Sequence, residues 1–376
     1  MDKKLNILFL CGWYPSRVFP NNGDFIQRHA KAVSLLHNVI VLHIISDKNC
    51  IKNIEIESTT INGIKTHIGY VKETNNSILK CIWFWKVYKT LLKKIDRFDV
   101  VHLNELFPFG IFALHLKWFK KIPFIISEHW TGYHKSQSNK ISFQEKFISK
   151  RIAKRATYIC PVSNHLKKAM LTFGLKGNYV PVPNVVDTKL FIPKENNINR
   201  FTIVHVSSMN DGHKNISGML EVAKLLENEG INFSWNFIGG NENKFLTLLK
   251  KLQFTTAKIN FIDHISQKDL SAYLQNAHIF VLFSNYENLP CVILEAFSCG
   301  LPVISTNVGG INEYFPKNFG VLIEKGNKNQ LLESIKKMYN QKKTNENEMH
   351  KYAVKNFSEK EIGNRFSDLY YKMLNK

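Results

Sequence analysis

Two glutamates eight residues apart, Glu287 and Glu295, stand at the start of a predicted helix that follows a buried run at 281–284. The helix is expected to begin near Leu289, so Glu287 lies just before its N-terminus and Glu295 lies within it. Unpaired N–H groups at a helix N-terminus favour a phosphate or diphosphate. An ionised carboxylate beside them accepts two hydrogen bonds from a sugar diol. The segment suits a phosphorylated sugar, and by itself it equally suits an ordinary helix with one glutamate in its first turn and another at its edge.

Short apolar runs alternate with amphipathic segments along the chain, which is typical of a parallel sheet covered by helices. We expect these strands and helices to position the two glutamates. Predicted strands in the first part of the chain are 5–11, 39–45, 64–70, 99–103, 123–127 and 158–162. After a polar stretch at 193–199, the predicted strands are 201–207, 233–239, 258–262, 278–283, 302–305 and 321–323. The fold class is therefore α/β, with two doubly wound Rossmann-like domains at 1–193 and 200–357 facing a central cleft at the carboxyl ends of their strands.

Charge is distributed unevenly along the 376 residues. Lys and Arg number 51 against 30 Asp and Glu, a net charge of +21, and residues 1–200 carry +18 of it. A polyanionic partner is one explanation, and a general richness in lysine is the other. The six cysteines form no CxxC pair, so neither zinc nor disulfides are indicated, and a reducing cytoplasm fits. No apolar stretch reaches the length of about 18 residues that spans a membrane.

Several familiar phosphate and metal motifs are missing. The chain has no G-x-G-x-x-G, no P-loop, no HExxH, no Asp-x-Asp and no G-x-S-x-G. The chain therefore lacks the main phosphate-binding motifs of nicotinamide enzymes and of P-loop NTPases, which argues against both classes. We expect neither a metal nor a cofactor.

The two glutamates belong to a longer pattern that resembles the retaining glycosyltransferases of family 4 (glycosyl transferases group 1), which have the GT-B fold. Ala296, the Cys-Gly-Leu-Pro-Val run at 299–303 and the Gly-Gly-Ile-Asn-Glu run at 309–313 continue that pattern. Further segments resembling the family are Trp-Tyr-Pro-Ser at 13–16, Asn-Gly-Asp-Phe at 22–25, Ser-Glu-His at 127–129, Pro-Val-Ser at 161–163, and Pro-Asn-Val-Val-Asp at 183–187 with Phe191. These segments occur in the right order over nearly the whole chain.

The resemblance implies a role for each matching residue. Glu287 would contact the donor sugar, Lys214 would neutralise the diphosphate leaving group, and His129 would face the donor sugar; these three are the predicted catalytic residues. Predicted donor-binding residues are Glu295 at the ribose, the backbone of Asn288, Leu289 and Pro290, Ser208, and Gly23 in the first loop. The family usually has an arginine where this chain has Ser208. Its replacement is left open between His213 and a basic residue of the first domain. Asn288 stands where glycine is common, and asparagine is among the residues that best tolerate a positive φ if one is needed there.

By the same resemblance, domain 1–193 binds the acceptor and domain 200–357 binds a UDP- or GDP-sugar, while a C-terminal helix at about 358–376 packs back on the first domain. The implied activity is metal-independent, retaining transfer of a hexose to a lipid-linked or surface-polysaccharide glycan precursor. A nucleotide-sugar epimerase of the same fold and a non-catalytic member are the alternatives. A nucleic-acid-binding protein is disfavoured, because only the charge supports it. Acceptor specificity is expected in loops such as 130–139.

A basic segment at 78–95 is predicted to form a helix. Its core-facing arc would hold Ile78, Cys81, Phe84, Trp85, Tyr88, Leu91, Leu92 and Ile95. The opposite side mixes Lys80, Lys86, Lys89, Lys93 and Lys94 with Leu79, Ile82, Trp83 and Val87. Lysines among aromatic and aliphatic side chains suit the surface of an anionic membrane. We therefore expect a cytoplasmic protein that lies peripherally on the inner face of the cell membrane, although packing of Trp83 and Ile82 under a neighbouring loop would explain the same pattern.

Overall fold

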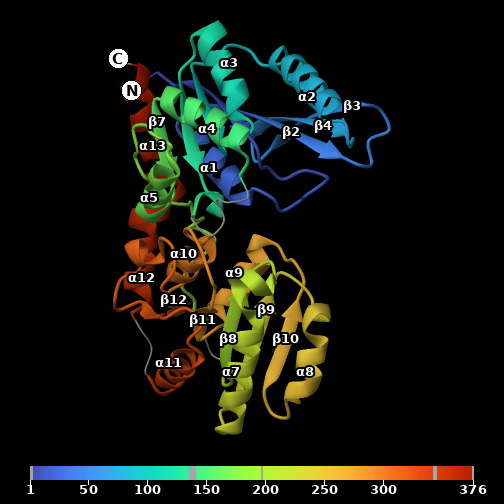
Figure 1. The fold of residues 1–376 in the computed structure, drawn as a ribbon. Coiled ribbons are helices and arrows are strands. Elements are labelled where there is room, and N and C mark those ends of the chain that lie inside the picture. Colours follow the sequence, from blue (N-terminus) through green and yellow to red (C-terminus); the bar gives the residue numbers. More distant parts are fainter. Residues whose placement is uncertain (1–2, 135–140, 196–197, 342–344, 375–376) are drawn as a thin grey trace. The chain divides into compact units, whose positions relative to one another are not determined.

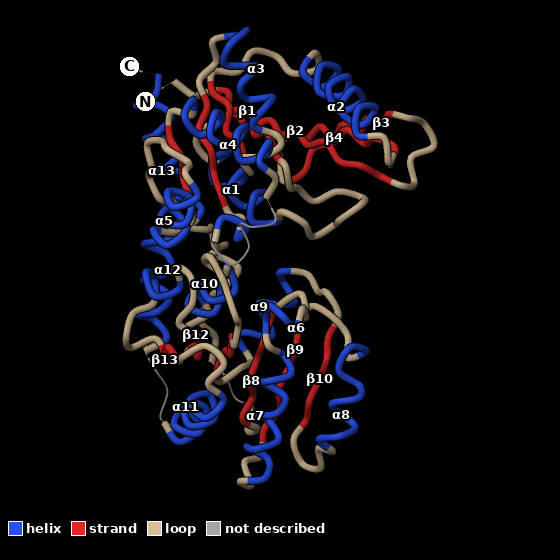
Figure 2. Tube along the Cα trace, in the orientation of Figure 1, coloured by secondary structure: helices blue, strands red, loops and turns tan. Residues whose placement is uncertain are grey.

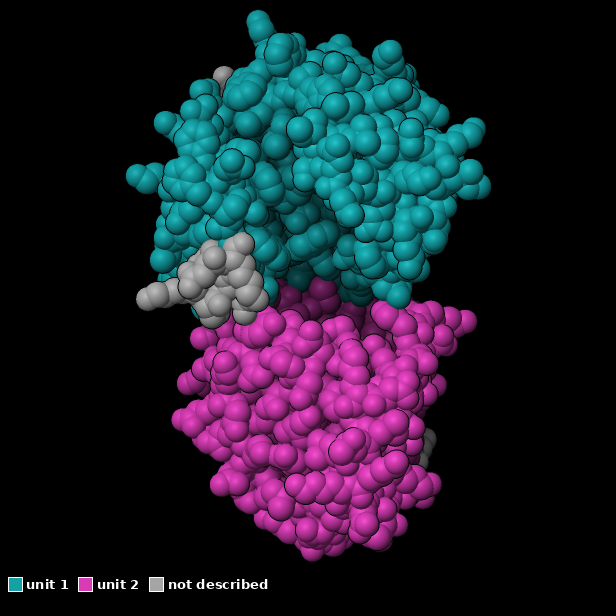
Figure 3. Space-filling view, turned by 45° about the vertical axis from the view of Figure 1, so that its right-hand side comes forward, with its two compact units in different colours: residues 1–185, 359–376 teal, residues 186–358 magenta. Residues whose placement is uncertain are grey.

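The computed structural model describes residues 3–134, 141–195, 198–341 and 345–374. The chain divides into two compact units: unit 1 comprises 1–185 with 359–376, and unit 2 comprises 186–358 (Figure 3). Part of the loop 130–139, in which the sequence places acceptor specificity, lies outside the described residues.

Unit 1 is built on a seven-stranded sheet of order β3-β4-β2-β1-β5-β6-β7 (Figure 1). Its strands are β1 (Asn6–Cys11), β2 (Asn38–Asp47), β3 (Ile54–Ile61), β4 (Ile64–Lys72), β5 (Val100–Asn104), β6 (Phe124–Glu128) and β7 (Tyr158–Pro161). All neighbours are parallel except β3 and β4. The sequence analysis missed β3, which is joined to β4 by Asn62 and Gly63 at φ 50° and 78°. An Asn-Gly pair in that conformation is the usual two-residue hairpin turn.

Helices cover both faces of this sheet (Figure 2). On one face, α1 (Asp24–Ser34) packs against α13 (Glu359–Leu374), where Gly363 lies on the backbone of Ala32. On the other face lie α2 (Ser77–Leu92), α3 (Gly110–Lys120) and α4 (Phe143–Arg155). Tyr88 stacks on Phe112 with ring centroids 4.2 Å apart, and Gly110 lies on Ile152. The described part of unit 1 also contains the short η1 (Thr131–Tyr133) and α5 (Asn164–Phe173).

The expected inner and outer sides of α2 are partly wrong. Ile78 and Cys81, assigned to the core, are exposed, whereas Val87, assigned to the outside, is buried against Gly69. The reason is that only the second half of the helix packs on the sheet. A single periodicity over the whole segment cannot represent a helix that is buried at one end only.

Unit 2 contains a six-stranded parallel sheet of order β10-β9-β8-β11-β12-β13. Its strands are β8 (Phe201–Val206), β9 (Phe233–Ile238), β10 (Lys258–Ile262), β11 (Ile279–Leu282), β12 (Val303–Thr306) and β13 (Gly320–Ile323). The helices are α6 (Asp211–Lys214), α7 (Ile216–Asn228), α8 (Leu246–Leu252), α9 (Gln267–Gln275), α10 (Cys291–Ser298), α11 (Lys328–Asn340) and α12 (Glu346–Phe357). Two 3-10 turns, η3 (Asn243–Phe245) and η4 (Ile311–Tyr314), complete it. Its core is rich in aromatic residues and centres on the fully buried Trp235.

The boundary between the units lies earlier than the polar stretch predicted. Val186 donates its N–H to the carbonyl of Phe357 at 2.9 Å, and Ser298 donates to the carbonyl of Phe191 at 2.5 Å. Residues 186–193, which the sequence assigned to the first domain, therefore belong to unit 2. The helix expected at 358–376 is α13, and it belongs to unit 1: His102 Nδ1 and the hydroxyl of Tyr370 are 2.6 Å apart.

Candidate active site

The segment that carries the first glutamate of the pattern connects β11 to α10 in unit 2. Glu287 and Asn288 are 7% and 6% exposed, and Leu289 is buried as well. The helix begins at Cys291, two residues later than predicted, because Pro290 has an extended conformation at its N-cap. Glu295 is inside α10 and 1% exposed, so it is neither a surface residue nor at the helix edge. Both carboxylates are therefore buried, which is rare for glutamate unless the side chain has a partner.

Lys214 forms an ion pair with Glu287 through Nζ and Oε1. The lysine ends the short α6 in the loop after β8, and Asn210 caps that helix by accepting from the N–H of His213. Strands β8 and β11 are neighbours, and the connections that follow them lead to opposite sides of the sheet. This is the topological switch point, where open α/β sheets bind ligands. The structure thus brings the predicted sugar-binding carboxylate and diphosphate-binding cation together.

His213 joins the same two loops. Its Nε2 donates to the carbonyl of Tyr286 at 2.7 Å, and the two rings stack 4.0 Å apart at an interplanar angle of 3°. Asn285 donates its backbone N–H to the carbonyl of His213 at 2.7 Å. Burial and then the charge of Lys214 lower the pKa of His213, although Glu287 is only 3.6 Å away. His213 is therefore a neutral hydrogen-bond donor committed to Tyr286, which disfavours it as the missing second cation.

Two glycines of the pattern support the backbone of this segment. Gly309 has φ 65° and lies so close to the carbonyl of Glu287 that a Cβ would overlap it. Gly310 donates its N–H to the carbonyl of Asn288 at 2.8 Å. Asn288 does not have a positive φ, so asparagine in place of glycine causes no backbone strain here. The Gly-Gly pair thus fixes the path of the chain from Glu287 to Leu289.

The other predicted donor-binding residue of unit 2, Ser208, is exposed in the loop after β8. Its neighbour Met209 is buried with φ 52° and donates its N–H to the hydroxyl of Ser207 at 3.2 Å. Ser208 carries no positive charge, and so Lys214 is the cation that the described structure places beside Glu287.

In unit 1, His129 follows β6 and is surrounded by rings, with Phe25 at 4.5 Å and His29 at 5.2 Å between centroids. Burial holds its pKa well below the ordinary histidine value, so the ring is neutral at pH 7. Gly23 precedes α1 with φ 74°, and a Cβ there would lie 2.6 Å from the carbonyl carbon of Trp13. Gly23 therefore allows the first loop to pack on itself and brings Phe25 to His129.

Glu105 is a candidate that the sequence analysis missed. It directly follows β5 with φ 76°, and its side chain lies against Gly12 at the end of β1, at the switch point of this sheet. Burial first, and then the charges of Glu128 and Glu145, raise the pKa of Glu105 to about 9. A neutral carboxylic acid here can donate one hydrogen bond. Its position two residues after the strand predicted at 99–103 was the available signal.

Neighbouring Glu128 anchors the loops around that residue. Its carboxylate accepts hydrogen bonds from the N–H groups of Leu106, His129 and Trp130 at 2.9–3.0 Å, and from the hydroxyl of Tyr133 at 3.2 Å. Burial nevertheless raises the pKa of Glu128, since its four donors are all uncharged. Glu128 is thus a structural anchor for the segment that carries His129.

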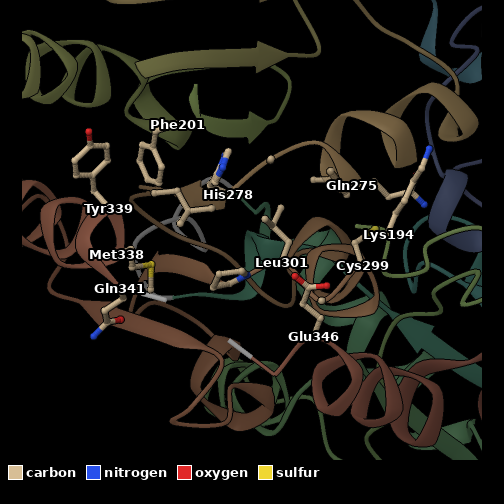
Figure 4. A pocket seen from close by; sticks show the side chains of 15 residues that line it. Lys194, Phe201, Gln275, His278, Cys299, Leu301, Met338, Tyr339, Gln341 and Glu346 are labelled. Carbon is tan, nitrogen blue, oxygen red and sulfur yellow. The ribbon is translucent and has the colours of Figure 1, made fainter. Parts of the chain in front are cut away.

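A pocket of unit 2, shown in Figure 4, lies away from Glu287 and Lys214. Phe201 and Ile279, the first residues of β8 and β11, line it together with His278 and Leu301. This is the amino end of the sheet, opposite to the end that carries Glu287. Within the described part of the chain, no three His, Cys, Asp or Glu side chains are grouped as metal ligands.

Comparisons with known proteins identify the family of the chain. The family model for glycosyl transferases group 1 matches residues 188–356, and the model for glycosyltransferase family 4 matches 36–190. The chain belongs to glycosyltransferase family 4. Its relatives include an uncharacterized glycosyltransferase of Methanocaldococcus jannaschii, 25% identical over 68% of this chain and 69% of that protein. A component of the human phosphatidylinositol N-acetylglucosaminyltransferase is 31% identical over 48% of this chain and 37% of its own length.

Solved structures show the same GT-B fold. Sucrose-phosphate synthase from Thermosynechococcus elongatus superposes with a TM-score of 0.79 at 16% identity, covering 99% of this chain and all of the other. HepE of Anabaena, solved with UDP and glucose, superposes with a TM-score of 0.74 at 15% identity, covering 98% and 99%. This family-4 chain is thus a glycosyltransferase of two Rossmann-like units. None of its described helices is long and apolar enough to cross a bilayer.

Proposed function

We propose that this glycosyltransferase moves a hexose from a UDP- or GDP-sugar to a lipid-linked or surface-polysaccharide glycan precursor, with retention of configuration and without a metal. The observation that carries the proposal is the Lys214–Glu287 ion pair at the switch point of unit 2. One partner suits a diphosphate and the other suits sugar hydroxyls, so a nucleotide diphosphate sugar satisfies both.

Lys214 would stabilise the negative charge that develops on the departing nucleotide, which is the role that a metal has in other transferases. The backbone of Asn288, Leu289 and Pro290 would approach the sugar and the diphosphate at the N-terminus of α10, and Glu295 would accept from the ribose hydroxyls. Ser208 would add a neutral hydrogen bond to the diphosphate. Donor binding thereby replaces the internal ion pair with contacts to the substrate.

Retention requires that the acceptor attack from the side of the leaving group, with a diphosphate oxygen taking the acceptor proton. In this one-step route no covalent intermediate forms, so Glu287 is not a nucleophile, and its carboxylate would instead accept hydrogen bonds from the sugar hydroxyls. In unit 1, neutral His129 would donate a hydrogen bond to the donor sugar, and Gly23 would let the first loop approach it. Unit 1 would supply the acceptor site.

The acceptor class is supported by what relatives are named for. Two of them are a Vi polysaccharide biosynthesis protein of Salmonella typhi and a putative teichuronic acid glycosyltransferase of Bacillus subtilis. The human relative is named for phosphatidylinositol, a lipid. A cytoplasmic enzyme lying peripherally on the inner membrane face would meet acceptors of these kinds.

The test is replacement of Glu287. We expect Glu287→Ala to lower transfer at least about a thousandfold, because the sugar loses its carboxylate and Lys214 loses its partner. Thermal shifts with a panel of UDP- and GDP-sugars would identify the donor and show that each variant is folded. The matched control is exposed Glu242 of the same unit, changed to Ala. Transfer near the wild-type rate by Glu287→Ala contradicts the proposal, and product formed from the donor alone identifies an epimerase instead.

A further inference from the structure

The helices on the two faces of the unit 1 sheet differ sharply in charge. Helices α2, α3 and α4 together carry ten Lys or Arg and a single acidic residue, Glu145. Helices α1 and α13, on the opposite face, carry five basic and four acidic residues. A chain that was merely rich in lysine would load both faces alike. Among these five helices, the excess positive charge therefore lies on α2, α3 and α4.

The charges on the two faces also have different partners. Across α1 and α13, Arg28 pairs with Asp24, Lys31 with Glu359 and Arg365 with Glu361. In the described structure none of the ten basic side chains of α2, α3 and α4 forms an ion pair; several lie over aromatic rings instead. These contacts are Lys80 over Phe84, Lys89 over Trp85, Lys146 over Phe173 and Arg151 over Phe147. The positive field of this face is left uncompensated by the protein.

The same three helices expose large apolar side chains. Those that are 39–84% exposed are Ile78 and Ile82 on α2, Ile111, Trp118 and Phe119 on α3, and Phe143 and Phe147 on α4. Phe143 and Phe119 are the most exposed, at 84% and 77%. Isolated apolar groups on a surface are ordinary, but seven on three adjacent helices among unpaired cations are not.

We propose that the basic face, defined as the outer sides of α2, α3 and α4, docks on an anionic lipid bilayer. Lysines attract acidic headgroups, while Trp, Phe and Ile enter the boundary between headgroups and acyl chains. A nucleic acid would satisfy the lysines but would leave Ile78, Ile82 and Phe119 in water. The basic face is the membrane partner surface of the proposed enzyme. This docking proposal rests on the proposed function only in taking the acceptor to be a lipid.

The experiment measures partition of the full chain onto vesicles by flotation, with and without phosphatidylglycerol in phosphatidylcholine. The charge variant is Lys80→Glu, Lys86→Glu and Lys89→Glu, three exposed side chains of α2. The matched control makes the same charge change in unit 2, at Lys244, Lys250 and Lys251. Each basic residue near an anionic surface raises partition roughly fivefold, so the charge variant should lose at least about a hundredfold and the control far less.

A second variant, Ile78→Ser with Ile82→Ser and Phe119→Ser, tests insertion and keeps every charge. We expect it to weaken partition at least about tenfold even at high salt, where electrostatic attraction is screened. Equal loss in the charge variant and its unit 2 control would overturn the proposal, as would unchanged binding by the apolar variant. Binding of random duplex DNA more tightly than anionic vesicles would overturn it in favour of a nucleic acid. Transfer to a soluble acceptor analogue is measured separately, so that failure of docking is not confused with failure of the proposed chemistry.

Discussion

The two units differ in the polar residues that they hold at the carboxyl ends of their strands. In unit 2, Lys214 and Glu287 form an ion pair. In unit 1, burial lowers the pKa of His129 and raises that of Glu105, so both side chains are uncharged near pH 7. An ion pair at one sheet thus contrasts with two uncharged hydrogen-bonding groups at the other.

This difference matches the two halves of a glycosyl transfer. A departing nucleotide diphosphate gains negative charge, and a fixed cation stabilises it. A sugar or glycan acceptor stays uncharged, and neutral donors and acceptors recognise its hydroxyls without a large desolvation cost. The contrast between the ion pair of unit 2 and the uncharged groups of unit 1 supports the proposal that unit 2 binds the donor diphosphate and unit 1 the acceptor.

Acid should have the largest effect on the difference between the units, because we expect it to unfold unit 1 before unit 2. Burial lowers the pKa of His29 and His43 to about 4, and lowers those of His37, His102 and His129 as well. Below pH 6.5 these histidines bind protons in the unfolded chain but stay neutral in the folded unit. The free energy of unfolding therefore falls as the pH drops toward 4, by roughly 3 kcal/mol for each histidine with a pKa of about 4. The raised pKa values of Glu105, Glu128 and Glu145 act in the opposite direction, because acid neutralises these carboxylates in the unfolded chain, but the histidines with lowered pKa values outnumber them.

Hydrogen exchange followed by segment between pH 7 and pH 4.5 measures this loss. Strands β1, β2 and β5 should lose protection at a higher pH than β8 and β11, since burial lowers the pKa values of five histidines named above in unit 1 but of His205 and His213 in unit 2. His29→Gln, which keeps a donor for the carbonyl of Pro183, should move the unit 1 transition to lower pH. Loss of protection at one common pH would contradict the prediction.

Lys214→Ala tests the charged side of the comparison. Removal of the cation should lower kcat about a thousandfold, because no other cation of the described structure lies beside Glu287. Lys214→Arg, which keeps the charge, should recover a substantial part. The control is Lys224→Ala, whose ion pair with Glu227 lies in the same unit. Steady-state kinetics measure kcat and KM for each variant. A change in KM alone would show that Lys214 acts only in binding.

His213→Ala removes the neutral group that joins the two loops of unit 2. The hydrogen bond to Tyr286 and the stacked rings hold Glu287 in position, so their loss should lower kcat/KM about tenfold to thirtyfold. His213→Gln, which can still donate to the carbonyl, should restore most of the activity. If His213 instead carried positive charge to the diphosphate, the glutamine would be as poor as the alanine and activity would fall as pH rises through the pKa of the wild-type ring.

The sequence predicted the general architecture well because strand and helix periodicities are local properties. Glu287, Lys214 and the Gly-Gly pair were found through a pattern of residue types, and the structure explains why those types are needed. His213 and Glu105 gained their roles only from contacts between distant segments: with Tyr286 in one case, and with Gly12 in the other. The assignment of 186–193 to the first domain was wrong for the same reason: Val186 donates to Phe357, and nearly the whole sequence of unit 2 lies between these two residues.

Ser208→Arg offers the smallest effect and the finest test of how much charge the donor site needs. The family pattern places an arginine here, and the exposed side chain of Ser208 leaves room for one. A guanidinium can bind a diphosphate through two parallel hydrogen bonds, so donor affinity should rise about fivefold to tenfold. Lys214 already neutralises part of the leaving group, which limits the gain in kcat. Calorimetry with the donor compares Ser208→Arg with Ser208→Lys; equal gains would assign the effect to charge alone, and no gain in either would show that the diphosphate does not pass this loop.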